Sequence, residues 1–509
     1  MGKLPKIISL FLCIIFVFSG CTQKYDIVDH HDYSSALLEE DFSNGEFDFS
    51  SSNTQGASSI ISYEELISGT ISKEGSSSLT ESGSSNSTSS KHTLSASTSS
   101  NITTKNPATT TGKPASSSKP ATTSKPSTNN QTSSGYTPVY YSEMKAVWLS
   151  YYNFYYDINK NATTFRNYAK TIMQNIKKFG FNTVIVHLRS HGDAIYDSAY
   201  FPWSNIVGGK NPGYDPTQIL IEEAHAQNLS FHAWFNPLRL AAPSVVAGLN
   251  NKYQTKQWYN SKLGDYVVSW KVNDATTYCY LNPAYSEVRT LIANGAKEIA
   301  QKYKVDALHI DDYFYPTTDA RFDEKAYASI GGGKSLDYFR RNNINMLIRE
   351  IYSAVKSVNG KLKFGISPGG NVERNKNELY ADTTTWLQNS GYMDYCIPQI
   401  YWGYNHKTHD FKKITNQWKN LATNNSVDLI IGLGFYKVAN KEYENDGGSD
   451  EWIKDQTIIS RQVKDTKTIL GSKYNGFAVF DYDYLFETPS GIMDTTLHNN
   501  AKSELKKVM

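Results

Sequence analysis

The chain has 509 residues, of which 39% are hydrophobic, 13% aromatic and 20% charged, and its formal net charge at pH 7 is +2. A charge this close to neutral gives no sign of a nucleic-acid-binding surface, so no nucleic-acid partner is expected. With four cysteines and no CxxC or Cys/His cluster, the sequence excludes a disulfide framework and gives no sign of structural zinc. We expect Cys279 and Cys396 to be buried small hydrophobic residues.

The first residues are typical of an exported protein. Lys3 and Lys6 precede an almost wholly apolar run over 7–18, which is too short for a bilayer span of about 20 residues. A basic start and a short apolar run before small residues predict a secretory signal. A Ser-Gly step before Cys21 resembles a bacterial lipobox, in which the cysteine receives lipid and becomes the mature N-terminus. We therefore expect a lipoprotein signal over 1–21, lipidation of Cys21 and an anchor at the cell membrane outside the cytoplasm. An ordinary signal peptide and an uncleaved anchor are the alternatives.

Residues 22–135 have the composition of a tether. The part up to about residue 71 is acidic and poorly patterned, and the part from about 72 to 134 is rich in Ser and Thr, with Lys-Pro steps at Pro114, Pro120 and Pro126. Such a segment has too few apolar residues to offset the entropy lost on ordering, so we expect a disordered linker. Its plain role is to hold a folded domain, predicted over 140–509, away from the membrane.

Eight repeats of a strand followed by a helix fill the rest of the chain. The predicted strands cover 145–152, 182–189, 230–237, 307–314, 363–370, 395–402, 428–435 and 476–483. Helical patterns lie at 164–179, 217–227, 286–303, 336–357, 383–389, 411–423, 452–470 and 498–508. Strands that alternate with helices predict a parallel sheet. Eight units, without a GxGxxG after the first strand, predict an α/β fold of the closed (β/α)8 or TIM-barrel type rather than an open Rossmann sheet.

Polar and apolar side chains alternate along several of these strands. Because neighbouring side chains point to opposite faces, the apolar set should pack under the helices and the polar set should face the barrel axis. Barrel interiors are usually filled by branched aliphatic side chains, so polar residues that converge near one rim predict a functional site. The polar residues of this parity are His187 and Arg189, then His232, Trp234 and Asn236, then His309 and Asp311, and finally Gln399 and Tyr401.

Asp311 is the first candidate for catalysis because it ends the fourth predicted strand on the inward parity. Hydrolysis of a glycosidic bond needs two carboxyl groups, one ionised as nucleophile or base and one protonated as acid. Asp312 has the outward parity, but it lies at the strand end, where the chain can turn it into the cleft. The candidates for the second catalytic carboxylate are, in order, Asp312, Asp481 and Glu373. Each of these acids can instead serve a structural role, as a helix cap or as the partner of an arginine.

Aromatic residues accumulate at or just beyond the strand ends. The C–H faces of sugars stack on aromatic rings, so an aromatic-lined cleft suits a glycan, although core packing is the ordinary role of any single ring. The aromatic residues expected to bind substrate are Trp203, Trp234, Tyr313, Tyr401, Trp402, Tyr436 and Tyr482.

Several long stretches, in order along residues 143–486, resemble one known family. Among them are AVWLSYY, HLRSHGDAIYDSAYFPWS, DALHIDDYFYP, FGISPGGNVERNK and IPQIYWGY, which are similar to the glycosyl hydrolase-like 10 family of bacterial lipoproteins. The resemblance implies a TIM-barrel hydrolase, and some relatives are implicated in cutting peptidoglycan glycan strands stripped of their peptides. It implies that Arg189, His232, Asn236, Arg239, Asp311, Asp312, Gln399 and Trp402 lie in or near the cleft, and we add His191 to the expected substrate-binding residues. The family usually carries a bulky residue and Trp before Arg-Asn where GGNVERN stands here, which sets Glu373 apart from the family pattern.

Three interpretations of the function are open. The first is a glycoside hydrolase that acts outside the cytoplasm on a complex polysaccharide, such as peptidoglycan glycan strands, as a monomer without cofactor or metal. The second is a catalytically silent lipoprotein that binds glycans. The third is a metal-dependent hydrolase or deacetylase that uses His187, His232 and His309 with Asp311, although these histidines lack the close HxH spacing of many barrel metal sites.

Overall fold

The computed structural model describes residues 135–509 apart from 155–156, 274–275 and 488–492. The predicted signal peptide, Cys21 and the predicted tether up to residue 134 lie outside the described residues. Within the described part of the chain, no helix combines the length and the apolar character needed to cross a membrane.

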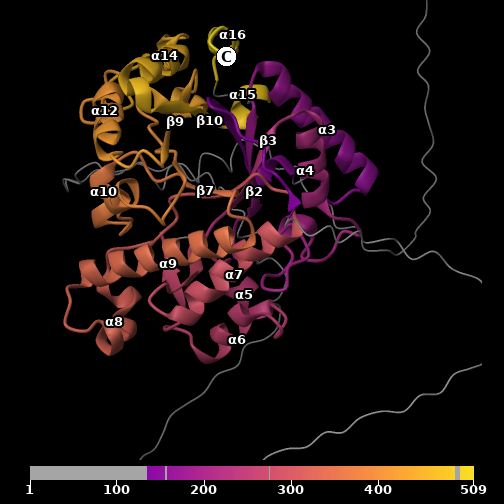
Figure 1. Ribbon diagram of the computed structural model, residues 1–509, viewed down its shortest axis with the longest axis vertical. Coiled ribbons are helices and arrows are strands. Elements are labelled where there is room, and N and C mark those ends of the chain that lie inside the picture. Colours follow the sequence, from indigo (N-terminus) through magenta and orange to yellow (C-terminus); the bar gives the residue numbers. More distant parts are fainter. Residues whose placement is uncertain (1–134, 155–156, 274–275, 488–492) are drawn as a thin grey trace, which may run out of the picture.

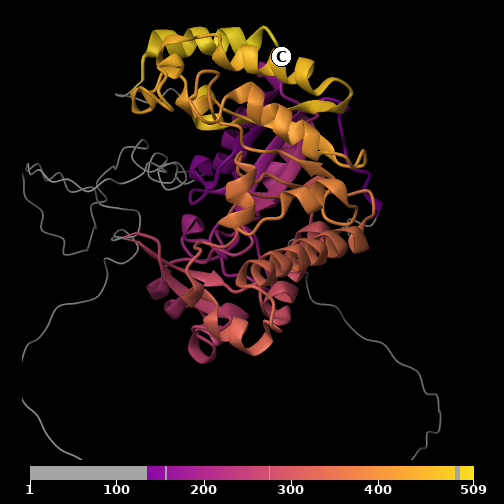
Figure 2. The ribbon, with the colours of Figure 1, turned by 90° about the vertical axis from the view of Figure 1, so that its left-hand side faces the viewer.

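Eight parallel strands close into a barrel, surrounded by helices (Figures 1 and 2). Around the barrel the strands follow the order β1-β10-β9-β8-β7-β6-β3-β2. Their bounds are β1 Met144–Leu149, β2 Thr183–Arg189, β3 Ser230–Phe235, β6 Ala307–Ile310, β7 Lys363–Ile366, β8 Tyr395–Cys396, β9 Asp428–Gly434 and β10 Tyr474–Phe480. Each of the eight predicted strands overlaps one of these, so the predicted (β/α)8 barrel is confirmed.

The helices that cover the barrel are also those that the periodicity predicts. They are α3 Ala162–Phe179, α4 Pro216–Ala226, α7 Ser286–Lys302, α9 Leu336–Val358, α11 Thr383–Gln388, α12 Phe411–Leu421, α14 Ile458–Leu470 and α16 Thr495–Lys506. The single helix expected over 452–470 is wrong at its start, because a short helix, α13 (Glu451–Lys454), precedes α14. Between them the Asp455 carboxylate accepts a hydrogen bond from the backbone N–H of Thr457 at 2.8 Å, which fixes a turn.

An insertion between β3 and α7 is absent from the predicted elements. It contains two short helices, α5 (Pro243–Gly248) and α6 (Gln254–Ser261), and an antiparallel hairpin of β4 (Val267–Lys271) and β5 (Thr277–Leu281). Three more short helices, α8 (Glu324–Ile330), α10 (Val372–Asn377) and α15 (Tyr482–Phe486), also escape the prediction. Helices of five to eight residues are too short to show a helical period in the sequence.

β8 is the shortest strand of the barrel, and Pro398 explains why. Proline has no backbone N–H to donate to a neighbouring strand. The chain nevertheless stays beside β9, since the Pro398 carbonyl accepts from the N–H of Gly432 at 2.9 Å and the Ile400 N–H donates back to the Gly432 carbonyl at 3.0 Å. The segment predicted as a strand over 395–402 therefore runs alongside its neighbours, but only its first two residues, Tyr395 and Cys396, form a regular strand.

The interior of the barrel is filled largely by the ring of Tyr395. A β-carbon at Gly365, on the neighbouring strand β7, would lie 1.9 Å from the Cζ atom of that ring. The Tyr395 hydroxyl lies 2.8 Å from Nδ1 of His232 and 3.1 Å from Nδ1 of His309, all three residues being buried. Burial lowers the pKa of His309 to about 3, so its imidazole is neutral. The barrel axis thus contains a hydrogen-bonded group of polar side chains, set among apolar residues such as Ile185 and Ile430.

We predict that Gly365→Ala lowers the free energy of unfolding by about 1–3 kcal/mol, the usual cost of overpacking. The added methyl group must displace the Tyr395 ring and with it the hydrogen bonds to His232 and His309. Urea unfolding followed by far-UV circular dichroism measures the change. Gly360→Ala is the matched control, because a β-carbon there meets no atom within 4 Å. Equal stability of the two variants would show that the ring does not depend on the glycine.

Candidate active site

Asp311 follows the last residue of β6, and its carboxyl group is buried against the interior of the barrel. Its side chain is only 3% exposed. Oδ2 accepts a hydrogen bond from the indole N–H of Trp234, on the neighbouring strand β3, at 2.8 Å, and Oδ1 accepts a longer one from the backbone N–H of Tyr313 at 3.4 Å. Burial raises the pKa of Asp311 to about 6, against the opposing effects of the Trp234 hydrogen bond and the positive charge of Arg239. The inward orientation predicted for Asp311 and Trp234 is confirmed.

A layer of aromatic and cationic side chains surrounds this carboxyl group. The His187 ring stacks on the Trp234 ring with centroids 3.7 Å apart, and the Tyr151 ring meets His187 edge-on at 5.3 Å. The guanidinium of Arg239 lies 4.2 Å from the ring centroid of Tyr313. Burial and the charge of Arg239 hold the pKa of His187 well below its usual range. Arg239 therefore brings a positive charge to the site, whereas the imidazole of His187 is neutral.

Asp312 also turns toward the barrel mouth, as the sequence leaves open. Its Oδ1 accepts a hydrogen bond from the side-chain amide of Gln399 at 3.1 Å. The same amide donates to the carbonyl oxygen of Ser367 at 2.9 Å, so Gln399 is fixed from two sides. The carboxyl groups of Asp311 and Asp312 therefore sit in different environments. The Asp311 carboxyl group accepts from the indole of Trp234, which stacks on the neutral imidazole of His187. The Asp312 carboxyl group accepts from the amide of Gln399, in the segment after β8.

The two other candidate carboxylates lie on other elements than Asp311. Asp481 precedes α15, where burial, with a further contribution from Glu487, raises its pKa to about 7. Within the described residues, no hydrogen bond joins it to Asp311. Its neighbour Asp483 accepts a hydrogen bond from the Asn153 side chain, and burial raises the pKa of Asp483 as well. Glu373 is exposed on α10, where it accepts a hydrogen bond from Asn377 at 3.3 Å.

The expectation that Arg189 faces the barrel axis is wrong. The register between β2 and β3 shifts between His187 and Arg189, and this irregularity reverses the alternation of side chains. The Arg189 guanidinium lies 3.8 Å from the ring centroid of Phe201 and against Gly295 of α7, where a β-carbon would come within 2.5 Å of Nη1. Arg189 is thus buried between the barrel wall and a covering helix.

Tyr482 is also located behind the wall rather than at the mouth. Its hydroxyl accepts a hydrogen bond from Asn175 of α3 at 3.2 Å, and its ring stacks on Phe486 at 4.7 Å. The side chain is 2% exposed. The prediction that it lines the cleft is wrong, because the chain turns into α15 immediately after β10.

His232 lies at the opposite end of the barrel from Asp311. With Tyr140, Ser230 and Lys363 it lines a cavity of about 370 Å³ at the N-terminal ends of the strands. Its predicted place near the catalytic cleft is therefore wrong, since the parity of a residue does not give its height along the barrel. The three histidines of the metal-dependent alternative do not form one group. His232 and His309 both contact the hydroxyl of Tyr395, whereas His187 stacks on the ring of Trp234. Among the residues that the structure describes, no group of three or more His, Cys, Asp or Glu side chains could hold a metal ion.

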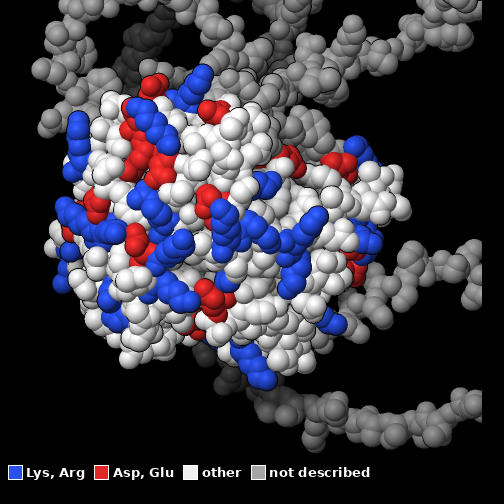
Figure 3. All heavy atoms as spheres, turned by 90° about the horizontal axis from the view of Figure 1, so that it is seen from above, with Lys and Arg blue, Asp and Glu red and all other residues white. Residues whose placement is uncertain are grey.

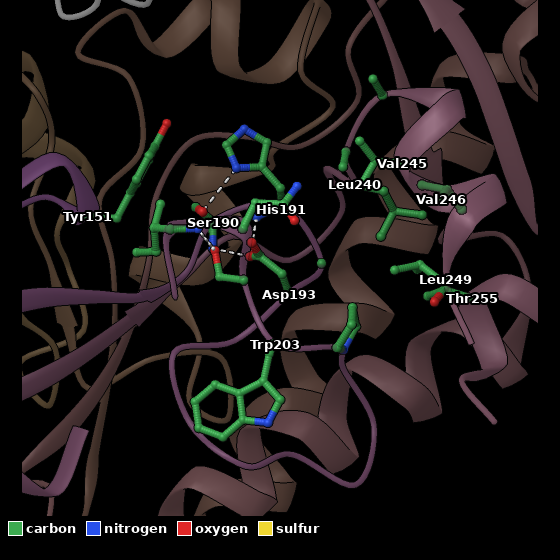
Figure 4. Close-up of a pocket in the computed structure, with 17 residues that line it drawn as sticks. Tyr151, Ser190, His191, Asp193, Trp203, Leu240, Val245, Val246, Leu249 and Thr255 are labelled. Carbon is green, nitrogen blue, oxygen red and sulfur yellow. Dashed lines mark hydrogen bonds between the residues drawn. The ribbon is translucent and has the colours of Figure 1, made fainter. Parts of the chain in front are cut away.

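Asn236, His191 and Trp203 lie on the side of the insertion. The side-chain oxygen of Asn236 accepts a hydrogen bond from the backbone N–H of Arg239 at 3.1 Å, which shapes the turn that delivers the guanidinium. Half-buried His191 and Trp203 line a pocket with Tyr151 (Figure 4).

Tyr401, Trp402 and Tyr436 are packed into the rim behind Gln399. The Tyr401 and Tyr436 rings meet edge-on at 5.7 Å, and the Trp402 ring stacks on His409 at 4.6 Å. All three are buried. They support the wall that carries Gln399 rather than presenting open ring faces.

Tyr151, Tyr278 and Ser367 are site residues that the sequence analysis misses. Tyr278 belongs to the β4–β5 hairpin, and its ring centroid lies 5.6 Å from the Arg239 guanidinium. The alternation of aromatic and other residues in the segment TYCYL is the sequence signal that could have revealed Tyr278. Cys279 and Cys396 are free and buried, as expected.

The model of a family described as Glycosyl hydrolase-like 10 matches residues 143–448. A protein described as Glycosyl hydrolase YngK from Bacillus subtilis (strain 168) is 34% identical over 381 residues, which cover 69% of this chain and 71% of that protein. Glycosyl hydrolase DigH from Escherichia coli (strain K12) is 30% identical over 351 residues, which cover 62% of this chain and 74% of that protein. These matches confirm the resemblance expected from the sequence.

Solved structures are more distantly similar. The alpha-L-fucosidase isoenzyme 2 from Paenibacillus thiaminolyticus aligns with a TM-score of 0.45 and 14% identity, over 72% of this chain and 49% of that one. The endo-1,4-beta-mannanase from Rhizomucor miehei aligns with a TM-score of 0.44 and 10% identity, over 72% of this chain and 94% of that one.

We predict that Asp311→Asn makes the protein more stable than the wild type above pH 6. A carboxyl group whose pKa is raised on folding contributes stability that is fully present below its unfolded pKa and is lost as pH rises through the folded value of about 6. The variant has no such loss, so its advantage should grow from pH 4 to pH 7 by up to about 3 kcal/mol. Urea unfolding across this range measures it, with exposed Asp337→Asn as control. A stability difference that does not change with pH would contradict the buried carboxyl group.

Proposed function

The chain belongs to the glycosyl hydrolase-like 10 family, and from this premise we propose that it hydrolyses glycosidic bonds of a complex polysaccharide outside the cytoplasmic membrane. The observation that carries the proposal is the pair of carboxyl groups after β6. Asp311 is buried with a pKa raised to about 6, and Asp312 is fixed by Gln399. Two carboxyl groups in different environments are what the reaction requires.

Asp311 is the proton donor in this proposal. With a pKa near 6, a substantial fraction of the molecules carries the proton at mildly acidic to neutral pH, and that proton can pass to the leaving glycosidic oxygen. The Trp234 indole and the Arg239 guanidinium both favour the carboxylate that remains after transfer. They are in place before substrate binds, so they stabilise the developing charge without reorganisation.

Asp312 is the second carboxyl group, acting as nucleophile or base on the other side of the sugar. The Gln399 amide donates to Oδ1 and is itself held by the Ser367 carbonyl, so the position of Asp312 depends on contacts from the segments that follow β7 and β8. Asp312 is preferred to Asp481, whose electrostatic neighbours are Asp483 and Glu487.

Glycan strands of peptidoglycan are the first candidate substrate. Half-buried Tyr313 and Trp203 offer parts of their rings to the C–H faces of sugars. Family resemblance and the exported character of the N-terminus support a wall polymer over an intracellular one.

We predict that Asp311→Asn and Asp312→Asn each lower the turnover of purified glycan strands by about 10²–10⁴-fold, the usual contribution of an acid or base group. Release of reducing ends measures the rate. Asp337→Asn, on the exposed surface of α9, should retain the wild-type rate. Full activity in either site variant would refute its role. Tight glycan binding without turnover by the wild type would favour a silent binding protein.

We propose further that the protein is anchored in the cell membrane through lipid on Cys21. Cells grown with an alkyne-tagged fatty acid should label the wild type and leave Cys21→Ala unlabelled and released from the membrane fraction. Cys13→Ala, within the predicted signal, should keep the label and serves as control. Membrane retention of an unlabelled Cys21→Ala protein would favour an uncleaved anchor instead.

A further inference from the structure

A second hollow lies on the outer side of the insertion, between α6 and the N-terminal half of α7, and we call it the outer groove. Its volume is about 590 Å³. The loop after β2 completes its wall, and the lining includes Tyr200, Gln254, Trp258, Glu287, Thr290 and Asn294. Neither Asp311 nor Asp312 belongs to this lining, so the groove is separate from the proposed catalytic carboxyl groups.

The outer groove is large enough for sugar rings. A cavity of about 150 Å³ accommodates a benzene ring, and binding sites for small molecules measure about 300–1,000 Å³. At about 590 Å³ the groove lies within that range. It is open along its length, since Thr290 on α7 and Lys252 before α6 are both exposed. A stretch of polymer can therefore lie in it without ending there.

Three side chains of the lining have hydrogen-bonding groups that the protein does not use. Trp258 is 8% exposed, and within the described part of the chain its indole N–H donates to no atom. The Trp258 ring is fixed in place, because the Tyr266 ring meets it edge-on at 5.2 Å. The amide of half-buried Asn294 and the hydroxyl of half-buried Tyr200 likewise have no hydrogen-bond partner among the described residues. These groups are available to a ligand.

Charge does not select the ligand of the outer groove. Its lining contains one cation, Lys252, and one anion, Glu287, and its other side chains are uncharged. Lysine and arginine side chains gather instead on the face shown in Figure 3, on the side of α14. Amides, hydroxyls and an indole N–H suit a ligand with many hydroxyl groups, and aromatic rings suit its C–H faces. Sugars combine both properties.

The outer groove lies one helix away from the rim of the barrel mouth. Thr255 of α6 lines the pocket shown in Figure 4, whereas Gln254 and Trp258 of the same helix line the groove. The loop after β2 is shared in the same way, with Trp203 in the pocket and Tyr200 in the groove. An α-helix with its side chains is about 10–12 Å across, so a glycan chain that leaves the mouth over the insertion can reach the groove.

We propose that the outer groove is a second binding site for the polysaccharide, which holds a stretch of the same chain outside the catalytic cleft. This rests on the proposed glycosidase function. Two sites on one polymer strengthen its binding because the second contact is intramolecular. A short oligosaccharide that fills only the cleft has no such gain, so the groove makes the protein prefer long chains.

Binding of two probes to the full-length protein tests the proposal. The probes are purified peptidoglycan glycan strands long enough to span α6 and a tetrasaccharide prepared from them, and the protein carries Asp311→Asn so that neither is consumed. We expect the long strands to bind about a hundredfold more tightly by calorimetry. Thr290→Arg places a long side chain in the groove from an exposed position and should reduce this preference about tenfold. Asn294→Ala, which removes one pair of hydrogen-bonding groups, should reduce it about fivefold.

Thr468→Arg is the matched control and should keep the preference, because Thr468 is exposed on α14, at the opposite end of the molecule from α6 (Figures 1 and 2). Equal binding of the two probes, binding of neither, or the same preference in the Thr290→Arg and Thr468→Arg proteins would overturn the proposal. Turnover by the protein with Asp311 intact is measured separately. Groove-dependent binding without turnover would remove the hydrolase function and keep the groove, and turnover with groove-independent binding would do the reverse.

Discussion

A carboxyl group buried at the end of a barrel strand needs a donor, and the indole N–H of Trp234 supplies it to Asp311 at 2.8 Å. This contact joins neighbouring strands β3 and β6, and the stacked ring of His187 extends it to β2. Because the group remains buried, its pKa stays near 6, where a proton can be given up at mildly acidic to neutral pH. The chemistry of the site thus depends on an interstrand contact within the barrel wall.

The interior below this contact contains polar groups, and the hydroxyl of Tyr395 partners two of them. Tyr395 fills the axis and bonds His232 and His309, while Gly365 makes room for its ring. Directional hydrogen bonds restrict the side chains that make them to one arrangement. This group of side chains gives the strands that carry Trp234 and Asp311 a defined relative position.

The insertion between β3 and α7 adds side chains to this rim. It carries Tyr278 beside Arg239, and its helix α5 contributes Val245 and Val246 to the pocket that Tyr151 also lines. Barrel enzymes vary their substrates mainly through the loops at the C-terminal ends of the strands. Here the carboxyl groups of Asp311 and Asp312 follow a strand end, and the insertion shapes the rim beside them.

The sequence by itself determined the eight strands, most of the helices and the inward orientation of Asp311, Trp234 and His187, because periodicity is a local property of the chain. Tertiary structure decided the rest. An irregular register turned the Arg189 side chain to the outer face of the barrel. The level of His232 along the barrel placed it away from the mouth, and the side chain of Gln399, beyond the end of β8, supplied a hydrogen bond to Asp312. Alternation along a strand gives the face on which a side chain lies. It does not give the height of that side chain along the barrel axis or the irregularities of strand pairing. It also does not give the hydrogen-bond partner that a segment distant in the sequence supplies.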